Sequence, residues 1–346
     1  MGRVALLLVS FVGLVALACA TGGGTEPSVR PTPASAPTEP VTPVAPTGEA
    51  GLTSAPEYQR MLTYEGSGQA VHPDVVFFPD GWHGFAYWMA MTPHPFDTAE
   101  RENPSILASH DGLDWVIPSG VRNPVVARPP CDHNSDPDLV YNPDTDELLL
   151  YYTDVRRSEF CGAGTNENFV KLVRSTDGVN WTEPQTVMSF DLDIYPVYVS
   201  PSVVYRDGQF QMWMASNTNA LIHTTSRDGV TWSPVEELAQ APRLWHVDVV
   251  YVEPKAEYWM LFVDSPLSGA ILGLAASQDG LSWSSCQAPV LTPSLGWDND
   301  RIYRSTFLYE EGIDLLRIWY SARSDAAEWR IGYTQGGYEE LRSAIC

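Results

Sequence analysis

A short motif recurs five times along this chain of 346 residues, and its regular return limits the fold more than any other feature. Its clearest copy is Asn134-Ser135-Asp136-Pro137-Asp138, which runs straight into the apolar, β-prone stretch Leu139-Val140-Tyr141. The other copies share the plan of a polar head and an apolar strand, and they lie at 72–77, 200–205, 246–251 and 304–309. A repeat of this period indicates an array of small supersecondary units.

A second motif, Ser-x-Asp-Gly-x-x-Trp, occurs in phase with the first, at 109–115, 175–181, 226–232 and 277–283. The Asp-Gly pair suits a tight turn, because glycine adopts positive φ freely and the Asp or Ser side chain can bond the turn's backbone. The Trp can pack between sheets. We therefore predict a structural role for these turns and not a catalytic one.

The runs between the two motifs alternate apolar and polar residues and are bounded by Gly, Pro, Asn and Asp, as in antiparallel meanders. We predict an all-β fold, a five-bladed β-propeller of four-stranded antiparallel blades that covers residues 56–346. The fifth blade lacks its own Ser-x-Asp-Gly turn, so segment 58–64 is expected to supply its outer strand and close the ring. Pro73, Pro137 and Pro201 recur immediately before the innermost strand, which favours a propeller because proline is tolerated at a strand's start.

The first 55 residues are expected to lie outside this fold. Residues 1–19 have Arg3, an apolar run too short for a stable membrane anchor, and small residues before Cys19, a pattern that resembles a bacterial lipoprotein signal. Cys19 would then carry the lipid, and ordinary cleavage after residue 20 is the alternative. Residues 20–55 are rich in Thr and Pro and predict a disordered linker. We expect an extracytoplasmic protein of the cell envelope, lipid-anchored or secreted.

Charge and cysteine content agree with export. A formal charge of -23 argues against nucleic-acid or anionic-membrane partners, so membrane contact is expected only through the lipid anchor, and we expect a monomer. With Cys19 set aside, four cysteines remain, and in an oxidising compartment they allow three pairings. We favour Cys131 with Cys161, which the predicted blades bring to one rim, and Cys286 with Cys346. Their spacing is too wide for a zinc site.

Five blades, a short motif at the head of each inner strand and the Ser-x-Asp-Gly-x-x-Trp turns resemble the arabinanase, levansucrase and invertase superfamily, which includes glycoside hydrolase family 43. The resemblance implies a base in the first blade, a carboxylate that tunes pKa in the second and a Glu general acid in the third. By position these fall on His72 or Asp74, on Asp136, and on 199–201, where no Glu stands. Glu102, on a loop of the same rim, is our predicted substitute acid, and Glu159 is the second choice.

We accordingly predict a carbohydrate-active protein, a glycoside hydrolase acting on an oligosaccharide or polysaccharide, with Asp74, Asp136 and Glu102 as catalytic residues. Glycoside hydrolysis needs one protonated and one ionised carboxyl group, and acids crowded at one channel mouth raise each other's pKa. Each Asp has an alternative role, which is to bond backbone N–H groups where a strand begins. The alternative function is a propeller that binds glycans of the cell envelope without catalysis.

The same rim supplies the predicted substrate-binding residues. Trp245 and Trp297 can stack on sugar rings, and the guanidinium of Arg304 can grip a carboxylate or a pair of hydroxyls. Polar contacts to sugar are expected from the residues at matching registers of the inner strands, namely His72, Asp138, His246 and Asp248. No cofactor or metal is predicted, although the resemblance implies a calcium ion near a channel histidine as an alternative.

Overall fold

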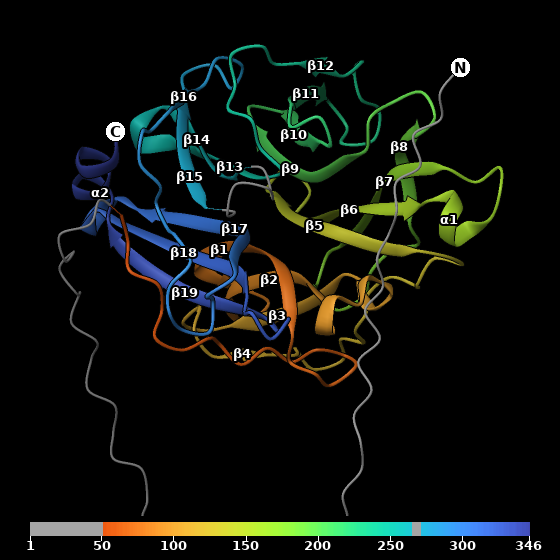
Figure 1. Ribbon diagram of the computed structural model, residues 1–346, viewed down its shortest axis with the longest axis horizontal. Helices are drawn as coiled ribbons and strands as arrows, with labels where there is room; N and C mark the ends of the chain where they lie inside the picture. The colour runs from red at the N-terminus through yellow and green to blue at the C-terminus, as the bar shows by residue number, and fades with distance from the viewer. Residues whose placement is uncertain (1–50, 265–270) are drawn as a thin grey trace, which may run out of the picture. The chain divides into compact units, whose positions relative to one another are not determined.

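The computed structural model describes residues 51–264 and 271–346, and its regular secondary structure is almost entirely β-strand (Figure 1). Four four-stranded antiparallel sheets and one three-stranded sheet follow one another along the chain. Each inner strand contacts the inner strand of the next sheet, and the fifth contacts the first. The sheets therefore close into a five-bladed propeller, which confirms the predicted fold class.

Each blade is a meander that starts at the channel. Blade 1 comprises β1 (Ala70–Trp82), β2 (Phe85–Pro93), β3 (Ser105–Ser109) and β4 (Trp115–Val116), and blade 2 comprises β5 (His133–Asn142), β6 (Glu147–Arg156), β7 (Glu167–Ser175) and β8 (Gln185–Asp191). Blade 3 comprises β9 (Tyr198–Arg206), β10 (Gln209–Ser216), β11 (Leu221–Ser226) and β12 (Glu236–Glu237). Blade 4 comprises β13 (His246–Val252), β14 (Glu257–Val263), β15 (Leu272–Ser277) and β16 (Ser284–Ser285), and blade 5 comprises β17 (Arg301–Glu310), β18 (Leu315–Arg323) and β19 (Trp329–Gly337).

Two short helices accompany the strands: α1 (Ser158–Cys161) follows β6, and α2 (Tyr338–Ile345) follows β19. Within the described residues, 3-10 turns occur in three loops: η1 (Pro95–Asp97) and η2 (Ala99–Arg101) between β2 and β3, η3 (Glu253–Lys255) between β13 and β14, and η4 (Glu311–Ile313) between β17 and β18. Since all five inner strands run in one direction, the loops from the second to the third strand of blades 1, 2, 3 and 5 emerge at the rim where the inner strands begin.

A ring of hydrogen bonds joins the five inner strands at one level of the channel. One side chain of each strand accepts a bond from a backbone N–H of the next strand. The pairs are Asp74 with Leu139, Asp138 with Val203, Ser202 with Val249, Asp248 with Phe307, and Thr306 with Val75. We call these five acceptor side chains the lower ring. Their bonds satisfy backbone donors on the inner edges of the sheets, which have no strand ladder to pair with.

The Ser-x-Asp-Gly turns lock neighbouring blades together. The indole of Trp319, on β18, donates to the carbonyl of Gly112 at 2.7 Å, and Trp213, on β10, donates to Gly280 at 2.7 Å. Gly178 has φ +72°, and a Cβ there would lie 2.3 Å from the ring of Trp88. Each turn thus docks on the second strand of the preceding blade, which confirms its predicted structural role.

Five clusters of buried apolar side chains fill the spaces between consecutive blades. The cluster between blades 5 and 1 includes Met61, Trp319 and Ile331, so the segment before β1 does contribute to ring closure. That segment lies beside β19, and Gln59 N–H donates to Ile331 O at 2.8 Å, but it forms no strand. The expected outer strand at 58–64 is therefore wrong, and blade 5 has three strands.

The folded part begins before the predicted boundary at residue 56. Leu52 N–H donates to Val290 O and the Thr334 hydroxyl donates to Thr53 O, both at 2.8 Å, so residues assigned to the linker pack against blades 4 and 5. The predicted signal segment, with Cys19, and the linker as far as residue 50 lie outside the described residues. Among the described residues, no helix is long and apolar enough to cross a membrane.

Both predicted disulfides are confirmed. Cys131, just before β5, is bonded to Cys161 at the end of α1, and Cys286, just after β16, is bonded to Cys346. The first bond joins two loops of the rim where the inner strands begin. The second holds the end of α2 against blade 4.

Replacing Ser202 with Ala should lower the free energy of unfolding by about 1–3 kcal/mol, because Val249 N–H would remain buried without its acceptor. Chemical denaturation measures this change. The matched control is Ser284→Ala on the exposed outer strand β16, where a change within about 0.5 kcal/mol is expected. Equal stability of the two variants would contradict the closing role of the lower ring.

Candidate functional site

Four inner strands, β1, β5, β9 and β17, shift register near their start. In three of them the shift falls at a residue in the left-handed conformation. His72, Asp136 and Ser200 have φ of 55°, 50° and 57°, each precedes a proline, and the strand register shifts at each point. Left-handed backbone at a residue other than glycine costs about 1–3 kcal/mol and persists where the surrounding structure enforces it. The three prolines therefore lie at bulges inside strands and not before the strands as predicted, because a bulge also leaves a residue unpaired.

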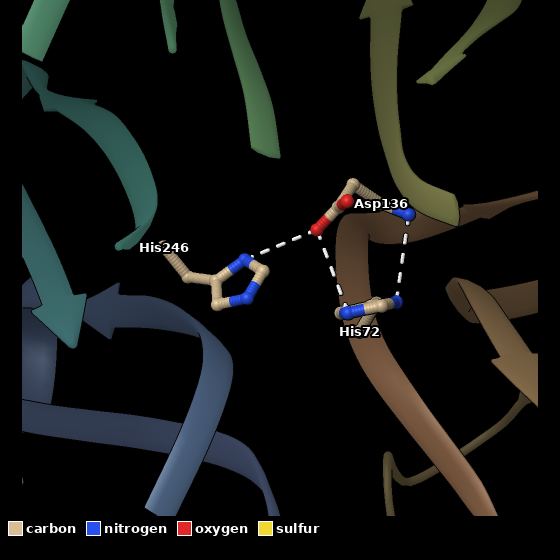
Figure 2. Close-up of side chains that lie close together, drawn as sticks. All are labelled: His72, Asp136 and His246. Carbon is tan, nitrogen blue, oxygen red and sulfur yellow. Dashed lines mark hydrogen bonds and ion pairs between the residues drawn. The ribbon is translucent and has the colours of Figure 1, made fainter. Parts of the chain in front are cut away.

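The residues two positions before the lower ring form a second level, which we call the upper ring: His72, Asp136, Ser200, His246 and Arg304. Three of them converge in Figure 2. Oδ1 of Asp136 lies 3.1 Å from Nδ1 of His246 and 3.5 Å from Nε2 of His72. Nη1 of Arg304 lies 3.9 Å from the same oxygen. All four of these side chains are buried, so their charges are poorly screened by water.

Glu102 reaches this cluster from the β2–β3 loop. Its Oε1 lies 2.8 Å from Nδ1 of His94, and its Oε2 lies 3.5 Å from Nδ1 of His72. The carboxylate is itself buried. The predicted substitute acid is thus brought next to His72, whereas Glu159 is exposed and pairs with Arg157 at 3.7 Å.

Tyr303, which the sequence reasoning missed, stands over the cluster. Its ring centroid is 4.2 Å from that of His246, 5.3 Å from that of His72 and 5.0 Å from that of Trp329. Tyr303 directly precedes Arg304, so its place at the head of an inner strand was the signal that could have found it.

Asp132 and His133 were also missed. The carboxylate of Asp132 accepts bonds from Nε and Nη2 of Arg157, at 2.8 and 2.9 Å, and lies 2.6 Å from Nδ1 of His133. Because Cys131 directly precedes Asp132, the disulfide to α1 holds this group in place. The two polar residues directly before the second copy of the repeated motif were the available signal.

The lower ring contains the other predicted acids. Asp74, Asp138 and Asp248 present carboxylate oxygens within 4.8 Å of one another, and each bonds a backbone N–H of the next strand. The acids predicted to crowd one channel mouth therefore lie on two levels, with Asp136 apart from these three. Two residues along a strand separate the two rings, and Asp74 lies with the structural carboxyls and not with Asp136 and Glu102.

A cavity of about 370 Å³ occupies the channel on the other side of the lower ring. Its walls are the lower-ring acids and residues that follow them along the inner strands, such as Tyr205 and Tyr251, and no upper-ring residue lines it. The cavity and the reactive side chains thus lie on opposite sides of the acids. We assign the candidate site to the cluster of His72, Asp136 and His246, because imidazole, carboxylate and guanidinium groups gather there.

Burial and mutual repulsion keep protons on the lower-ring acids. Burial raises the pKa of Asp248 to about 8, with the charge of Asp74 adding to the effect, and burial raises the pKa of Asp74 to about 6. Burial, with Asp74 and Asp248 nearby, also raises the pKa of Asp138 well above its usual value. Arg304 opposes all three shifts with a single positive charge, so the ring retains protons near neutral pH.

In the upper ring, by contrast, the pKa values of His72 and Asp136 are lowered. Burial lowers the pKa of His72 to about 4, so its imidazole is neutral at pH 7. Burial alone would raise the pKa of Asp136, but the neighbouring His72, His246 and Arg304 hold it well below its usual value. A neutral His72 supplies no charge, so the permanent charge of Arg304 remains beside Asp136 near pH 7. Burial likewise opposes ionisation of Glu102, yet His94 lowers its pKa, and Glu102 raises the pKa of His94 against burial.

Of the remaining predicted binding residues, Trp245 lies beside the cluster and Trp297 does not. Trp245 is half-buried beside His246, with ring centroids 5.7 Å apart. Trp297 instead stacks on Tyr320 at 5.5 Å and donates to Ala55 O, so it belongs to the packing between β18 and the N-terminal segment. The guanidinium of Arg304 donates to Pro201 O at 3.0 Å and lies 3.4 Å from Asp138, so it ties the two rings together.

The cluster of His72, Asp136 and His246 fits a divalent metal ion. Its three donor atoms lie within 4.8 Å of one another, and two imidazoles with one carboxylate form a ligand set that zinc and similar ions accept. Within the described residues, Oδ1 of Asp136, Nε2 of His72 and both ring nitrogens of His246 are buried without a well-directed hydrogen bond. Buried polar atoms of this kind need a partner, and one cation would bind Oδ1 of Asp136, Nε2 of His72 and one ring nitrogen of His246. The nearby charge of Arg304 opposes the cation, while Glu102 and Asp136 favour it.

The fold defines the class of the protein. It is a five-bladed propeller whose structural neighbours include enzymes of glycoside hydrolase families 43 and 62. A family 62 α-L-arabinofuranosidase of Coprinopsis cinerea superimposes with a TM-score of 0.59 and 12% identity over 83% of this chain and 98% of the other. A family 43 β-1,3-galactosidase gives 0.56 and 12% over 81% and 94%. At these identities the likeness concerns the fold alone.

A nearer similarity is to an enzyme of different chemistry. The chain is 31% identical over a 388-residue alignment to the A type blood N-acetyl-α-D-galactosamine deacetylase of Flavonifractor plautii, which covers 87% of this chain and 50% of the relative. The chain thus spans about half the length of that relative. A crystal structure of an N-acetylgalactosamine deacetylase from F. plautii with blood group B trisaccharide superimposes with a TM-score of 0.75 and 27% identity, over 85% of this chain and 97% of the other. No protein-family model matches.

The lower ring predicts a pH dependence of stability. A carboxyl whose pKa is raised on folding stabilises the native state fully below its unfolded pKa of about 4, and that contribution is lost as pH rises through about 8 for Asp248. Asp248→Asn keeps an acceptor for Phe307 N–H and removes the titration. The stability of wild type relative to this variant should therefore fall between pH 4 and pH 8.

Denaturation midpoints across this pH range, measured with a chelator present, test the prediction. Asp279→Asn, in an exposed Ser-x-Asp-Gly turn where the pKa of Asp279 is lowered, is the control and should show the opposite trend. If the difference in stability between wild type and Asp248→Asn does not change with pH, the raised pKa of Asp248 is contradicted.

Proposed function

We propose that this protein is a carbohydrate-active hydrolase that removes the acetyl group from an N-acetylated hexosamine of a glycan. The observation that carries the proposal is the buried cluster of His72, Asp136 and His246, with ligand atoms that lack partners, in a chain similar to an N-acetylgalactosamine deacetylase. The predicted O-glycoside hydrolysis is the rival chemistry, and the binding of a glycan without catalysis is the third alternative.

The arrangement of carboxyl groups favours amide hydrolysis over glycoside hydrolysis. A glycosidase flanks the scissile bond with one protonated and one ionised carboxyl group. Here the carboxyls with raised pKa, Asp74, Asp138 and Asp248, are bonded to backbone in the lower ring, and no Glu stands at 199–201. The acids beside the cluster, Asp136 and Glu102, both have lowered pKa. A protonated carboxyl for a sugar leaving group is therefore missing from this set.

A metal ion would complete the proposed site, which departs from our expectation that no cofactor is needed. His72, Asp136 and His246 would hold it, and it would polarise the amide carbonyl and lower the pKa of a bound water. Nδ1 of His72 lies 2.9 Å from the Thr92 hydroxyl, which can orient the ring as outer partners of metal-ligating histidines do.

The chain's own groups supply the proton transfers. Glu102 is ionised, and its Oε2 has no well-directed bond within the described residues, so it can accept the proton that a water loses when it attacks the carbonyl. His94 has a raised pKa and can return a proton to the amine as the C–N bond breaks. Burial raises the pKa of Tyr303, so its neutral hydroxyl can stabilise the developing oxyanion. The products are acetate and a free amino sugar.

Export from the cytoplasm is part of this proposal. Two disulfides suit an oxidising compartment, and the relative that is 31% identical in sequence is bacterial. Lipidation of Cys19 or simple secretion, and the monomeric state, stay predictions.

Incubation with a glycan that ends in N-acetylgalactosamine should release acetate and leave a sugar with a free amine. Asp136→Asn should lower kcat by at least about 100-fold, because it removes the charge at the centre of the cluster. Acetate assay and mass spectrometry of the glycan measure both outcomes, and Ser284→Ala serves as the unaffected control. If a monosaccharide is released without acetate, the protein is a glycosidase and this proposal is wrong. If neither the amide nor the glycosidic bond is cleaved, glycan binding without catalysis is the remaining alternative.

Metal binding can be measured apart from activity. After chelation, wild type should bind about one Zn²⁺ or Mn²⁺ per chain by isothermal titration, and His246→Ala should weaken binding by at least about 100-fold. The control is His223→Ala, because His223 lies on β11, outside the cluster. Circular dichroism checks that each variant is folded. Equal binding by wild type and His246→Ala would exclude this metal site.

A further inference from the structure

The β2–β3 loop holds two consecutive residues in the left-handed conformation at the rim above the site. Phe96 has φ 49° and ψ 50°, and Asp97 has φ 59°, both in the 3-10 turn η1. Neither is glycine, so each costs about 1–3 kcal/mol of backbone strain. Turns of this kind normally carry Gly, Asn or Asp at such positions, and a bulky aromatic there is unusual.

A set of polar contacts holds this turn in place. The carboxylate of Asp97 pairs with Arg323 through Nε–Oδ1 at 3.0 Å and Nη2–Oδ2 at 2.6 Å, and it accepts the indole N–H of Trp329 at 2.6 Å. Phe96 N–H donates to the Gln69 side chain at 3.1 Å, and so does Trp329 N–H. These bonds tie a loop of blade 1 to blade 5 and hold the backbone of the turn at Phe96.

The ring that this turn presents is directed to solvent. Phe96 is 61% exposed, whereas Trp329 beside it is 5% exposed. Single exposed apolar side chains are common on protein surfaces. At Phe96, however, the backbone is strained and the ion pair between Asp97 and Arg323 holds the turn in place. Neither the backbone strain nor the exposure of the Phe96 ring contributes to stability.

Contacts of its neighbours Asp97 and His94 connect the turn that carries Phe96 to the reactive cluster. Asp97 bonds Trp329, the ring of Trp329 lies 5.0 Å from that of Tyr303, and Tyr303 lies 4.2 Å from His246. His94, two residues before Phe96, pairs with Glu102. Phe96 thus lies outward of the groups proposed to act on the acetamide, on the same rim.

We infer that Phe96 is a stacking platform for the sugar ring that follows the acetylated hexosamine in the glycan, an inference that rests on the proposed function. A pyranose has an apolar face of C–H groups, and an aromatic ring offers a matching surface with a negative quadrupole. The side chain touches no reacting atom. It selects an oligosaccharide over a monosaccharide by binding its second unit.

The platform is tested with Phe96→Asn, because asparagine tolerates positive φ and keeps the backbone of the turn while it removes the ring. KM for an N-acetylgalactosamine-terminated trisaccharide should rise about 3- to 10-fold with unchanged kcat, the scale of one aromatic contact. KM for the methyl glycoside of N-acetylgalactosamine should stay within about 2-fold. Phe96→Trp should keep the wild-type preference.

Ile313→Asn is the matched control, because Ile313 is 66% exposed and lies in η4, between the first two strands of blade 5 at the opposite rim. It should leave both substrates unaffected. Equal losses for trisaccharide and methyl glycoside with Phe96→Asn would overturn the platform and show that the turn only positions His94. Unchanged KM for the trisaccharide would overturn it as well.

Binding measured without turnover separates this inference from the proposed function. Saturation-transfer NMR of the trisaccharide with chelated wild-type protein should show contact at the second sugar, and Phe96→Asn should abolish it. If no acetate is ever released but this difference appears, the deacetylase fails and the platform stands. If acetate is released and the difference is absent, the platform fails alone.

Discussion

Closure of the ring depends on the five hydrogen bonds of the lower ring. Inner strands of neighbouring blades run side by side without a ladder, and their backbone donors would otherwise face a narrow channel. Side chains of Asp74, Asp138, Ser202, Asp248 and Thr306 satisfy those donors, and each bond joins a blade to the next. Since three of the five acceptors are carboxyl groups, this way of closing the ring gathers acid at the axis.

That crowding divides the channel chemically. Three carboxyls with one guanidinium, that of Arg304, cannot all ionise in a buried place, so the lower ring retains protons. Two residues earlier along the same strands, imidazoles replace carboxyls around a single ionised Asp136. In the described part of the chain, Nε2 of His72 and both ring nitrogens of His246 have no well-directed hydrogen bond. One repeated motif thus gives a structural level and a reactive level.

Loops then decide what the reactive level can do. The β2–β3 loop brings Glu102 and His94 to His72 and displays Phe96, and the head of β17 adds Tyr303. Cys131 and Cys161 hold the neighbouring loops together next to Asp132 and His133. Structural neighbours named as glycosidases and one named as a deacetylase share this propeller fold, so the fold alone does not set the reaction.

The sequence alone determined the number of blades, the direction of the inner strands, the role of the Ser-x-Asp-Gly turns and the disulfide pairs, because each depends on local pattern and periodic spacing. It also brought His72, Asp136 and Glu102 to one rim. Only the tertiary structure decided that Asp74, Asp138 and Asp248 bond the neighbouring strands, that Trp297 packs beneath the N-terminal segment, and that Tyr303 covers the cluster. A shift of two residues along a strand moves a side chain from one ring to the other, and the partner that it meets there comes from a different blade. Contacts of that kind exist only after the ring has closed.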